Sequence, residues 1–471
     1  MTTPPTTTAT TTAATTVRTE PPSKGRRLLA LALITSALGL DIGGLNVMNA
    51  ALPAIGDRFH LADSTLQWAM TSYALGFAGF LLFGGRAADV LGRRFVFMIG
   101  VAVFAAAALA GALAPGMEVL IAARAVQGIG AALSGPAALA LLAEVFPPGR
   151  ERDHALGVYA AVGAAAGSGG FVLGGLLTDW FGWRSVLLVL AVLGAAVLAA
   201  APAGLPRGRR QSQPLDLTGA AAVTGGLVLT VFGVTRLSQE GWSDPAALTA
   251  LAVAFVLLAA FVAWERRTRL PLLPLTLFRS APVRAGTLAA FLNHTAAVGL
   301  QFFAPLYFQD MLGYSPVASG FAVLPLSLAV FVTANFFTGR LLGRWGLKPL
   351  LVTGLVLLGA GSALWMTTTE HSPYWLTMLP GLLVMGVGTG LTFPAMTAAA
   401  LTGVAPEQHG VAGAVNVTAQ QIGASVGVAA LVAASTAASG TLAGYHLAYL
   451  AAAIACGIAA AAVAASRLRT S

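Results

Sequence analysis

One carboxylate stands alone in a long apolar stretch of the sequence. Asp41 is the only charged residue between positions 28 and 53. At about 1.5 Å per helical residue it lies about 21 Å from Arg27 and about 24 Å from Asp57, near the middle of a bilayer core. A charge there costs at least about 2.5–3.5 kcal/mol. Burial favours the neutral form of a carboxyl, so Asp41 is a candidate proton carrier or counter-ion for a cation. The alternative is a structural carboxyl bonded to neighbouring backbone.

Other polar side chains also fall at membrane depth. They are candidates to line a substrate cavity, and for those of the second half interhelical hydrogen bonding is the alternative. His294 among them has a side chain that titrates near neutral pH in water. The candidate cavity residues are Asn46, Asn49, Tyr73, Gln127, Asn293, His294, Gln301, Asn416 and Gln420.

The composition shows what kind of element must hold these residues. Of the 471 residues, 57% are hydrophobic and 9% are charged, whereas soluble domains carry about 25% charged residues. Apolar runs of about 20 residues recur, each long enough to cross a bilayer as a helix. The sequence therefore predicts an all-α, polytopic membrane protein. The single cysteine, Cys456, excludes an internal disulfide and a cysteine-based metal site.

Fourteen spans are predicted from hydropathy and from charged, Pro and Gly breaks. They cover residues 28–52, 66–85, 95–115, 118–142, 155–178, 183–204, 216–237, 246–264, 285–308, 316–338, 349–369, 374–400, 411–434 and 442–465. The Thr- and Pro-rich tail of residues 1–27 has the composition of a disordered segment.

The basic residues orient this layout. If both termini lie in the cytoplasm, most of the 26 Lys and Arg residues fall in cytoplasmic loops or tails. Only Arg58, Arg184 and Arg236 fall outside, and Arg124 lies within a span. This asymmetry follows the positive-inside rule. The net charge of +9 is thus explained by topology, and no nucleic-acid partner is expected.

The sequence also contains an internal repeat. "GRAADVLGRR" at residues 85–94 recurs as "GRLLGRWGLK" at 339–348, and "QGIGAALSGPA" at 127–137 recurs as "MGVGTGLTFPA" at 385–395. Both pairs have nearly the same separation, which indicates duplicated halves, as in many transporters. We expect six-helix halves at residues 28–204 and 285–465. Residues 205–284 would form a basic linker with two inserted spans, and 466–471 a cytoplasmic tail.

These motifs resemble the major facilitator superfamily. "GGRAADVLGRRF" is similar to its loop signature between spans two and three, and "RAVQGIGAA" to its signature in span four. "NAALP", "LQWAMTSYAL" and "YFQDMLGYSP" resemble the 14-span drug:proton antiporter branch of the QacA/EmrB type. Two positions depart from that branch. The usual acid position is occupied by Gly44, with Asp41 displaced by about 60° and about 4.5 Å along the same helix, and Phe171 replaces the proline expected in span five.

The resemblance implies roles for particular residues. Asp41 and Arg124 would serve proton coupling, although a straight-helix estimate separates them by about 15 Å and makes a direct ion pair doubtful. The alternative for Arg124 is a structural role in which it only hydrogen-bonds helix ends near Glu118. Gly85, Asp89, Gly92, Arg93 and Arg94 would form a conformational latch at a tight cytoplasmic turn, for which a helix-capping turn is the alternative. The glycines of span five allow close helix contact.

The sequence thus predicts a secondary exporter of hydrophobic, drug-like or antibiotic compounds. It would act by proton antiport and alternating access in the bacterial cytoplasmic membrane. Its partners would be a small-molecule substrate, the proton and the lipid bilayer, and a monomer is expected. A dedicated exporter or a proton-coupled importer of one metabolite is the alternative. Phosphate-loop, zinc-protease and esterase motifs are missing from the sequence, so neither enzymatic activity, a cofactor nor a metal is expected.

Overall fold

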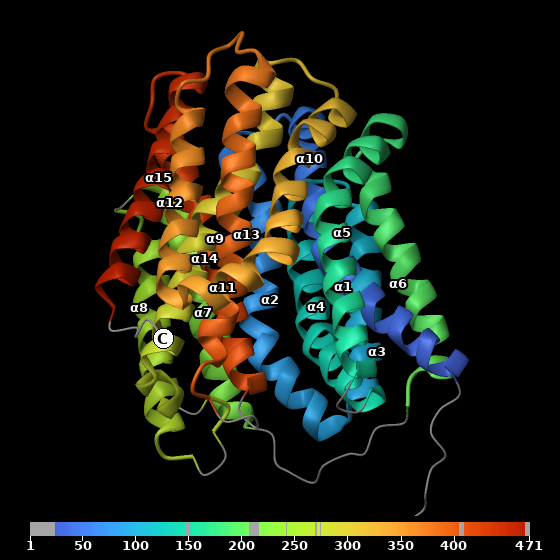
Figure 1. The fold of residues 1–471 in the computed structure, drawn as a ribbon. Helices are drawn as coiled ribbons and strands as arrows, with labels where there is room; N and C mark the ends of the chain where they lie inside the picture. Colours follow the sequence, from blue (N-terminus) through green and yellow to red (C-terminus); the bar gives the residue numbers. More distant parts are fainter. Residues whose placement is uncertain are drawn as a thin grey trace, which may run out of the picture.

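The computed structural model describes residues 24–146, 150–206, 216–241, 243–268, 271–273, 275–404 and 409–466. These residues form a bundle of long helices, with the start of α1 and the end of α15 at the same end of the bundle (Figure 1). Most of the predicted N-terminal tail, most of the basic linker and most of the C-terminal tail lie outside the described residues.

The first half contains six helices. They are α1 (Lys24–Phe59), α2 (Asp63–Leu91), α3 (Arg93–Ala112), α4 (Met117–Val145), α5 (Arg150–Phe181) and α6 (Arg184–Gly204). The predicted first span began at Leu28, but α1 already begins at Lys24 and continues past Pro53 to Phe59. The apolar stretch around Asp41 is therefore the middle of one continuous helix.

The second half follows an additional pair, α7 (Leu217–Glu240) and α8 (Pro245–Glu265). Its elements are the 3₁₀ turn η1 (Leu275–Arg279), α9 (Ala281–Leu306), η2 (Tyr307–Met311), α10 (Pro316–Val332), η3 (Thr333–Thr338), α11 (Gly339–Trp345), α12 (Leu347–Trp365), η4 (Tyr374–Met378), α13 (Leu379–Leu401), α14 (His409–Thr436) and α15 (Thr441–Ala465). The segments η2, η3 and η4 are π-helical, which the sequence did not predict.

A helix covers each predicted span. Among the described residues, 12 helical segments are long and apolar enough to cross a membrane. The helices α5 and α9 are not among these 12, but they are 32 and 26 residues long and pack inside the bundle. The chain is thus a multi-pass membrane protein with 12 candidate spans, and the count of fourteen stays a prediction.

The two halves repeat the same close helix crossing. A Cβ added to Gly130 on α4 would lie 2.7 Å from the carbonyl oxygen of Gly100 on α3. In the second half, a Cβ on Gly388 of α13 would lie 2.7 Å from the carbonyl oxygen of Gly354 on α12. Only glycine permits this approach of the two backbones. The repeat seen in the sequence therefore corresponds to a repeat in packing.

The two halves also share a turn and a clamp. Gly92, between α2 and α3, has a φ of 103°, and Gly346, between α11 and α12, has a φ of 76°. Two residues after each glycine a basic side chain holds the end of the last helix of that half. Arg94 donates to the carbonyl oxygens of Leu205 and Pro202, both at 3.2 Å, and Lys348 donates to that of Ser466 at 2.9 Å. Cations at helix C-termini are stabilising.

The largest contacts between the halves are those of α5 with α10 and of α2 with α14, and α1 adds smaller contacts with α9 and α10. On the first pair the backbones touch. A Cβ on Gly175 would lie 2.4 Å from the carbonyl oxygen of Pro316, and a Cβ on Gly320 would lie 2.6 Å from that of Phe171. This contact lies where α5 ends and α10 begins, at the end of the bundle opposite the start of α1 (Figure 1).

The α7–α8 pair packs beside the contact between α2 and α14. Helix α7 contacts both α2 and α14, so it touches both halves. Thr224 donates a hydrogen bond of 2.5 Å to the carbonyl oxygen of Gly79, and Phe232 packs against Trp68 with ring centroids 6.0 Å apart. The α7–α8 hairpin is therefore attached to the bundle along α2 rather than lying apart in lipid.

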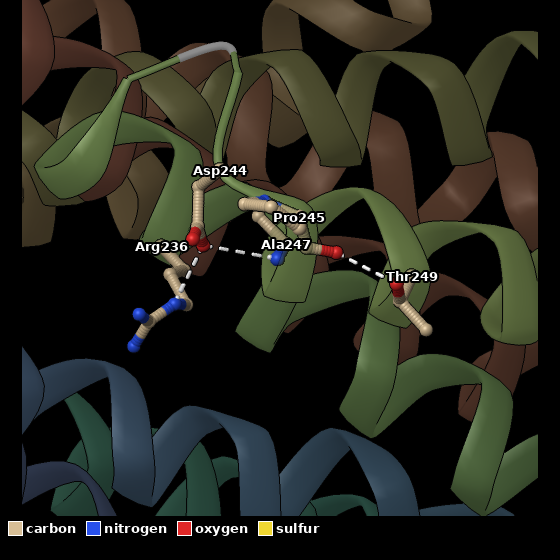
Figure 2. A network of polar contacts seen from close by, with 5 residues as sticks. All are labelled: Arg236, Asp244, Pro245, Ala247 and Thr249. Atoms are coloured by element: carbon tan, nitrogen blue, oxygen red, sulfur yellow. Dashed lines mark hydrogen bonds and ion pairs between the residues drawn. The ribbon is translucent and has the colours of Figure 1, made fainter.

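The turn of this hairpin is closed by Asp244 (Figure 2). Its carboxylate accepts from Arg236 Nε at 2.6 Å and from the N–H of Ala247 at 3.0 Å, which makes it the N-cap of α8. Desolvation acts to raise the pKa of Asp244, but the hydrogen bonds from Arg236 and Ala247 outweigh it and lower that pKa below its usual value.

Candidate functional site

Asp41 meets two other helices through one aromatic side chain. It lies half-buried in the middle of α1, and one of its carboxylate oxygens accepts a hydrogen bond from the hydroxyl of Tyr73 on α2. Tyr73 is fully buried and stacks on Phe77, one turn along the same helix, with centroids 6.2 Å apart. The sequence proposed Tyr73 as a cavity residue, and the structure places its phenol against the carboxylate.

Arg124 lies over the face of the same ring. Its guanidinium carbon is 4.4 Å from the centroid of Tyr73, within the range of a cation–π contact. Its Nε donates to the carbonyl oxygen of Ala69 at 3.0 Å, and another nitrogen donates to Gln127 Oε1 at 2.7 Å. Arg124 has no exposed surface. The buried cation is thus held by one backbone carbonyl, one amide and one ring.

Asp41 and Arg124 are therefore neighbours without a direct ion pair in the described part of the chain. Both contact the Tyr73 side chain, so their charged groups are closer than the straight-helix estimate of about 15 Å implied. That estimate counted positions along the helix axes and left out the length of the arginine side chain. Opposite charges at this range in a buried site attract strongly, because little water screens them.

Asp41 also borders a small pocket between three helices. Ser134 provides a second polar group there, and the remaining lining is apolar. The lining residues are Ala37, Leu40, Asp41, Val101, Phe104, Ala131 and Ser134. Phe104 is also 3.7 Å from a Cβ built on Gly44, the position where the related branch carries its acid. Positions 41 and 44 thus face the same neighbour, as expected for a displacement by less than one helical turn.

The other polar candidates of the first half have different surroundings. Asn46 donates 3.0 Å to the carbonyl oxygen of Gly167 on α5, Asn49 is buried on α1, and Gln127 accepts from Arg124. Of these three, Asn46 makes an interhelical hydrogen bond, whereas the bond of Gln127 lies within α4.

The five latch candidates are spread over a helix, a turn and the next helix. Gly85 lies inside α2 rather than in the turn, and the turn is made by Gly92 alone. Arg93 contacts the Ala140 carbonyl oxygen and the Glu144 carboxylate on α4, both at 3.3 Å. Arg94 clamps the end of α6, as described above. The side chain of Asp89 is outside the described residues.

In the second half, three candidates have bonded neighbours. Asn416 donates 3.3 Å to the carbonyl oxygen of Gly286, and Gln420 donates 2.8 Å to Asn416 Oδ1. His294 contacts the carbonyl oxygen of Ala290 at 3.1 Å and packs 6.2 Å from the Phe393 ring. These contacts link α9, α13 and α14.

Two other candidates of α9 behave differently. Asn293 has no exposed surface, and neither atom of its amide has a hydrogen-bond partner among the described residues. Gln301 lies two turns further along and borders a second small pocket with Thr389 of α13. That pocket is otherwise apolar, and its lining is Ala297, Leu300, Gln301, Ala304, Val323, Leu326, Val330, Leu358, Leu382, Met385 and Thr389.

Sequence reasoning missed two polar groups that border these pockets. Ser134 and Thr389 were not singled out, because hydroxyl residues inside helices usually bond their own backbone. Ser134 does so, donating 3.1 Å to the Gly130 carbonyl oxygen. The repeated motif held a signal for Ser134, since its counterpart Thr392 makes the same bond to Gly388 at 2.9 Å.

Comparison with known proteins agrees with this architecture. The family model for the Major Facilitator Superfamily matches residues 29–428 and 330–471. Among curated proteins, a puromycin resistance protein of Streptomyces alboniger is 38% identical over 413 residues, covering 85% of this chain and 80% of that protein. A cephamycin export protein of Amycolatopsis lactamdurans is 37% identical, covering 84% and 82%. A multidrug resistance protein of Mycobacterium tuberculosis is 33% identical, covering 85% and 74%.

Solved structures support the same fold at low sequence identity. A mutant form of the nucleoside transporter NupG superposes with a TM-score of 0.66 at 12% identity, covering 93% of this chain and 98% of that one. The human organic anion transporter MFSD10 superposes with a TM-score of 0.64 at 16% identity, covering 94% and 100%. With the family match across the chain and relatives of this similarity, the chain belongs to the major facilitator superfamily.

Proposed function

We propose that this protein exports antibiotic-class, largely apolar compounds across the bacterial cytoplasmic membrane in exchange for protons. The observation that carries the proposal is the half-buried Asp41 at a pocket in the middle of α1, in a chain whose relatives are named for resistance and export. A carboxyl at that depth is retained at high cost unless it works in ion or substrate movement.

In this mechanism Asp41 is loaded alternately with a proton and with a substrate. From the outside it takes up a proton, which removes its charge. From the inside, a substrate arriving at the pockets displaces that proton. The two halves rock about the α5–α10 and α2–α14 joints, so that the centre opens to one side at a time. The positive charge of Arg124, which lies over the Tyr73 ring, stabilises the ionised form of this carboxylate.

The remaining parts of the proposal concern topology. All fourteen helices that cover the predicted spans would cross the membrane, with both termini in the cytoplasm, as the basic residues indicate. Residues 28–204 and 285–465 would be the moving halves, and the α7–α8 hairpin would be the insert between them. Arg93 and Arg94, with Gly92 and Asp89, would stabilise one state of the cytoplasmic end.

The small pocket of the second half would contact an apolar part of the substrate when the centre opens. Its lining is apolar except for Gln301 and Thr389, and such pockets fix a ligand's orientation through a few polar groups. The candidates Asn293, His294, Asn416 and Gln420 would contact polar groups of the substrate when the centre opens.

The test is a susceptibility panel in an efflux-deficient bacterial host. Puromycin, cephamycin, lincomycin and methylenomycin A are suitable probes, because relatives of this chain are named for them. We expect the wild type to raise the inhibitory concentration of at least one probe and the Asp41→Asn variant, at equal membrane abundance, to raise none. Equal susceptibility with and without the wild-type protein, for every probe and for cell-accumulated dyes, would contradict the proposal.

A dedicated exporter of one metabolite is the second candidate. It is favoured because several relatives are each named for a single compound. The same panel separates the two, since protection against one probe alone supports the dedicated exporter. Increased accumulation of a probe in cells carrying the protein would instead support a proton-coupled importer.

A further inference from the structure

Tyr73 contacts an acid on α1, a cation on α4 and an aromatic ring on its own helix, and no other described side chain joins these three groups. Its hydroxyl donates to Asp41 on α1, its ring faces the Arg124 guanidinium on α4 at 4.4 Å, and its other neighbour is Phe77 on its own helix. The side chain has no exposed surface. The hydroxyl of this buried phenol is bonded to an acid, and its ring faces a cation. The phenol therefore interacts with both charges.

The backbone at Tyr73 is fixed to α4. A Cβ added to Gly128 would lie 2.1 Å from the carbonyl oxygen of Tyr73, so α2 and α4 touch at this level without room for side chains. Arg124 adds a bond of 3.0 Å from α4 to the Ala69 carbonyl oxygen of α2, one turn away. At this depth α2 and α4 therefore form one unit. The phenol of Tyr73 hydrogen-bonds this α2–α4 unit to the acid of α1.

Three titratable or charged groups surround Asp41. Tyr73 approaches from α2, Arg124 from α4 and Tyr159 from α5. Only Tyr73 is hydrogen-bonded to the carboxylate among the described residues. Tyr159 is a second phenol near the same acid, so it serves as a matched control for the first.

We propose that Tyr73 is a positioning residue that reports the protonation of Asp41 to the α2–α4 unit. This inference rests on the proposed role of Asp41 as the proton site. The ionised carboxylate accepts the phenolic O–H in a charge-assisted hydrogen bond, which is about twice as strong as a neutral one. When a proton binds, the carboxylate becomes a neutral carboxyl and the phenol keeps its own proton. The bond weakens, Arg124 loses the opposing charge across the ring, and α1 is released from α2 and α4.

The test is an infrared titration of the purified protein in lipid vesicles, in which the protonated-carboxyl band that disappears in Asp41→Asn is followed against pH without any substrate. Removing the donor in Tyr73→Phe destabilises the ionised carboxylate, so we expect the midpoint of this band to move up by about 1–2 pH units. Tyr159→Phe should leave the midpoint unchanged. Incorporation of 3-fluorotyrosine at position 73 makes the phenol a stronger donor and should move the midpoint down, which keeps the test valid if Tyr73→Phe does not fold.

The outcomes separate this inference from the proposed function. If Tyr73→Phe and the fluorinated variant both titrate like the wild type, the Tyr73 inference is wrong, even where Asp41→Asn abolishes proton exchange. Equal shifts in Tyr73→Phe and Tyr159→Phe would also overturn it, because they would indicate a general effect of phenols near the acid. If instead Asp41→Asn leaves proton exchange intact, the proton-site proposal itself fails.

Discussion

The amide of Asn293 is buried, and neither its nitrogen nor its oxygen has a hydrogen-bond partner among the described residues. Such a group costs about 1–3 kcal/mol, whereas replacement by an apolar side chain of similar size removes that cost. We predict that Asn293→Leu raises the thermal stability of the protein in detergent while lowering transport of the exported compound.

Asn416 provides the matched control for the Asn293 substitution. Its amide is bonded to Gly286 and Gln420, so Asn416→Leu should lower the stability instead. Thermal unfolding followed by intrinsic fluorescence measures both variants. A loss of stability in Asn293→Leu equal to that in Asn416→Leu would show that Asn293 has structural partners and is not kept for substrate.

Asp244 gives a residue-scale prediction about pH. Its pKa is lowered in the folded protein, so the stability it contributes is present above the ordinary value of 3.8 and is lost as the pH falls through the lower folded value. The effect is small because the Arg236 side chain of this pair is exposed to solvent. We expect Asp244→Asn, which keeps a capping side chain, to lose a little stability at pH 7 and none at acidic pH. A loss that does not change with pH would contradict the ion-pair account.

The types of the site residues were predictable from the sequence, and their connection was not. Asp41 and Arg124 stood out because charged side chains are rare at membrane depth. That Tyr73 lies between them depends on the rotation of α2 against α1 and α4, which hydropathy does not determine. Asn46 was proposed for a cavity, and the structure shows that its amide also hydrogen-bonds α5; a polar residue in a span can serve either role.

Close helix crossings are the feature that holds the site at the scale of the elements. Gly128 lets α4 approach Tyr73 on α2, and a Cβ there would overlap the Tyr73 carbonyl oxygen. We predict that Gly128→Ala separates the two helices, lowers the unfolding temperature by several degrees and reduces folded yield.

Gly135 is the control on the same helix, because no atom lies within 4 Å of a Cβ built on it. Gly135→Ala should be neutral or slightly stabilising, since alanine has the higher helix propensity. Fluorescence-detected size exclusion and thermal unfolding distinguish the two variants. Equal tolerance of both substitutions would show that the α2–α4 contact is looser than described here.

At this scale the sequence predicted the helices but not their irregularities. All fourteen apolar segments are covered by helices, because length and hydropathy are local properties. The π-helical segments η2, η3 and η4 occur only in the second half of the described chain and depend on packing that no local pattern records. The turn at Gly92 was predicted from glycine itself, whereas Gly85 was misplaced because a glycine is also tolerated inside a buried helix.

The contact between α5 and α10 joins the two halves at one end of the bundle. Gly320 allows the α10 backbone to lie against Phe171 of α5. We predict that Gly320→Ala forces this end of the bundle apart, so that spin labels placed on the ends of α5 and α10 report longer distances and transport slows.

Gly339 on α11 has no atom within 4 Å of a built Cβ, so Gly339→Ala should leave both the distances and the rate unchanged. The chain has a single cysteine, Cys456, which is buried, so labelling at introduced cysteines meets little background. Unaltered label distances in Gly320→Ala would show that this joint does not set the closed state.

A duplication of the whole molecule was predicted because two motifs repeat at nearly the same separation. The structure adds three features that the copies share. Gly130 and Gly388 lie at equivalent close helix crossings, and Gly92 and Gly346 make equivalent turns. Arg94 and Lys348 each bond the end of the last helix of their half. The attachment of α7 to both halves could not be predicted, since hydropathy places the insert in the membrane without saying beside which helices.

The central claim is that Asp41 exchanges a proton for substrate, and one measurement tests it directly. In inside-out membrane vesicles with a preformed pH gradient, we add the compound selected by the susceptibility panel. The wild type should dissipate the gradient, and Asp41→Asn, folded and present at equal abundance, should leave it intact. Dissipation by Asp41→Asn at the wild-type rate would show that the proton is carried elsewhere and would contradict the account.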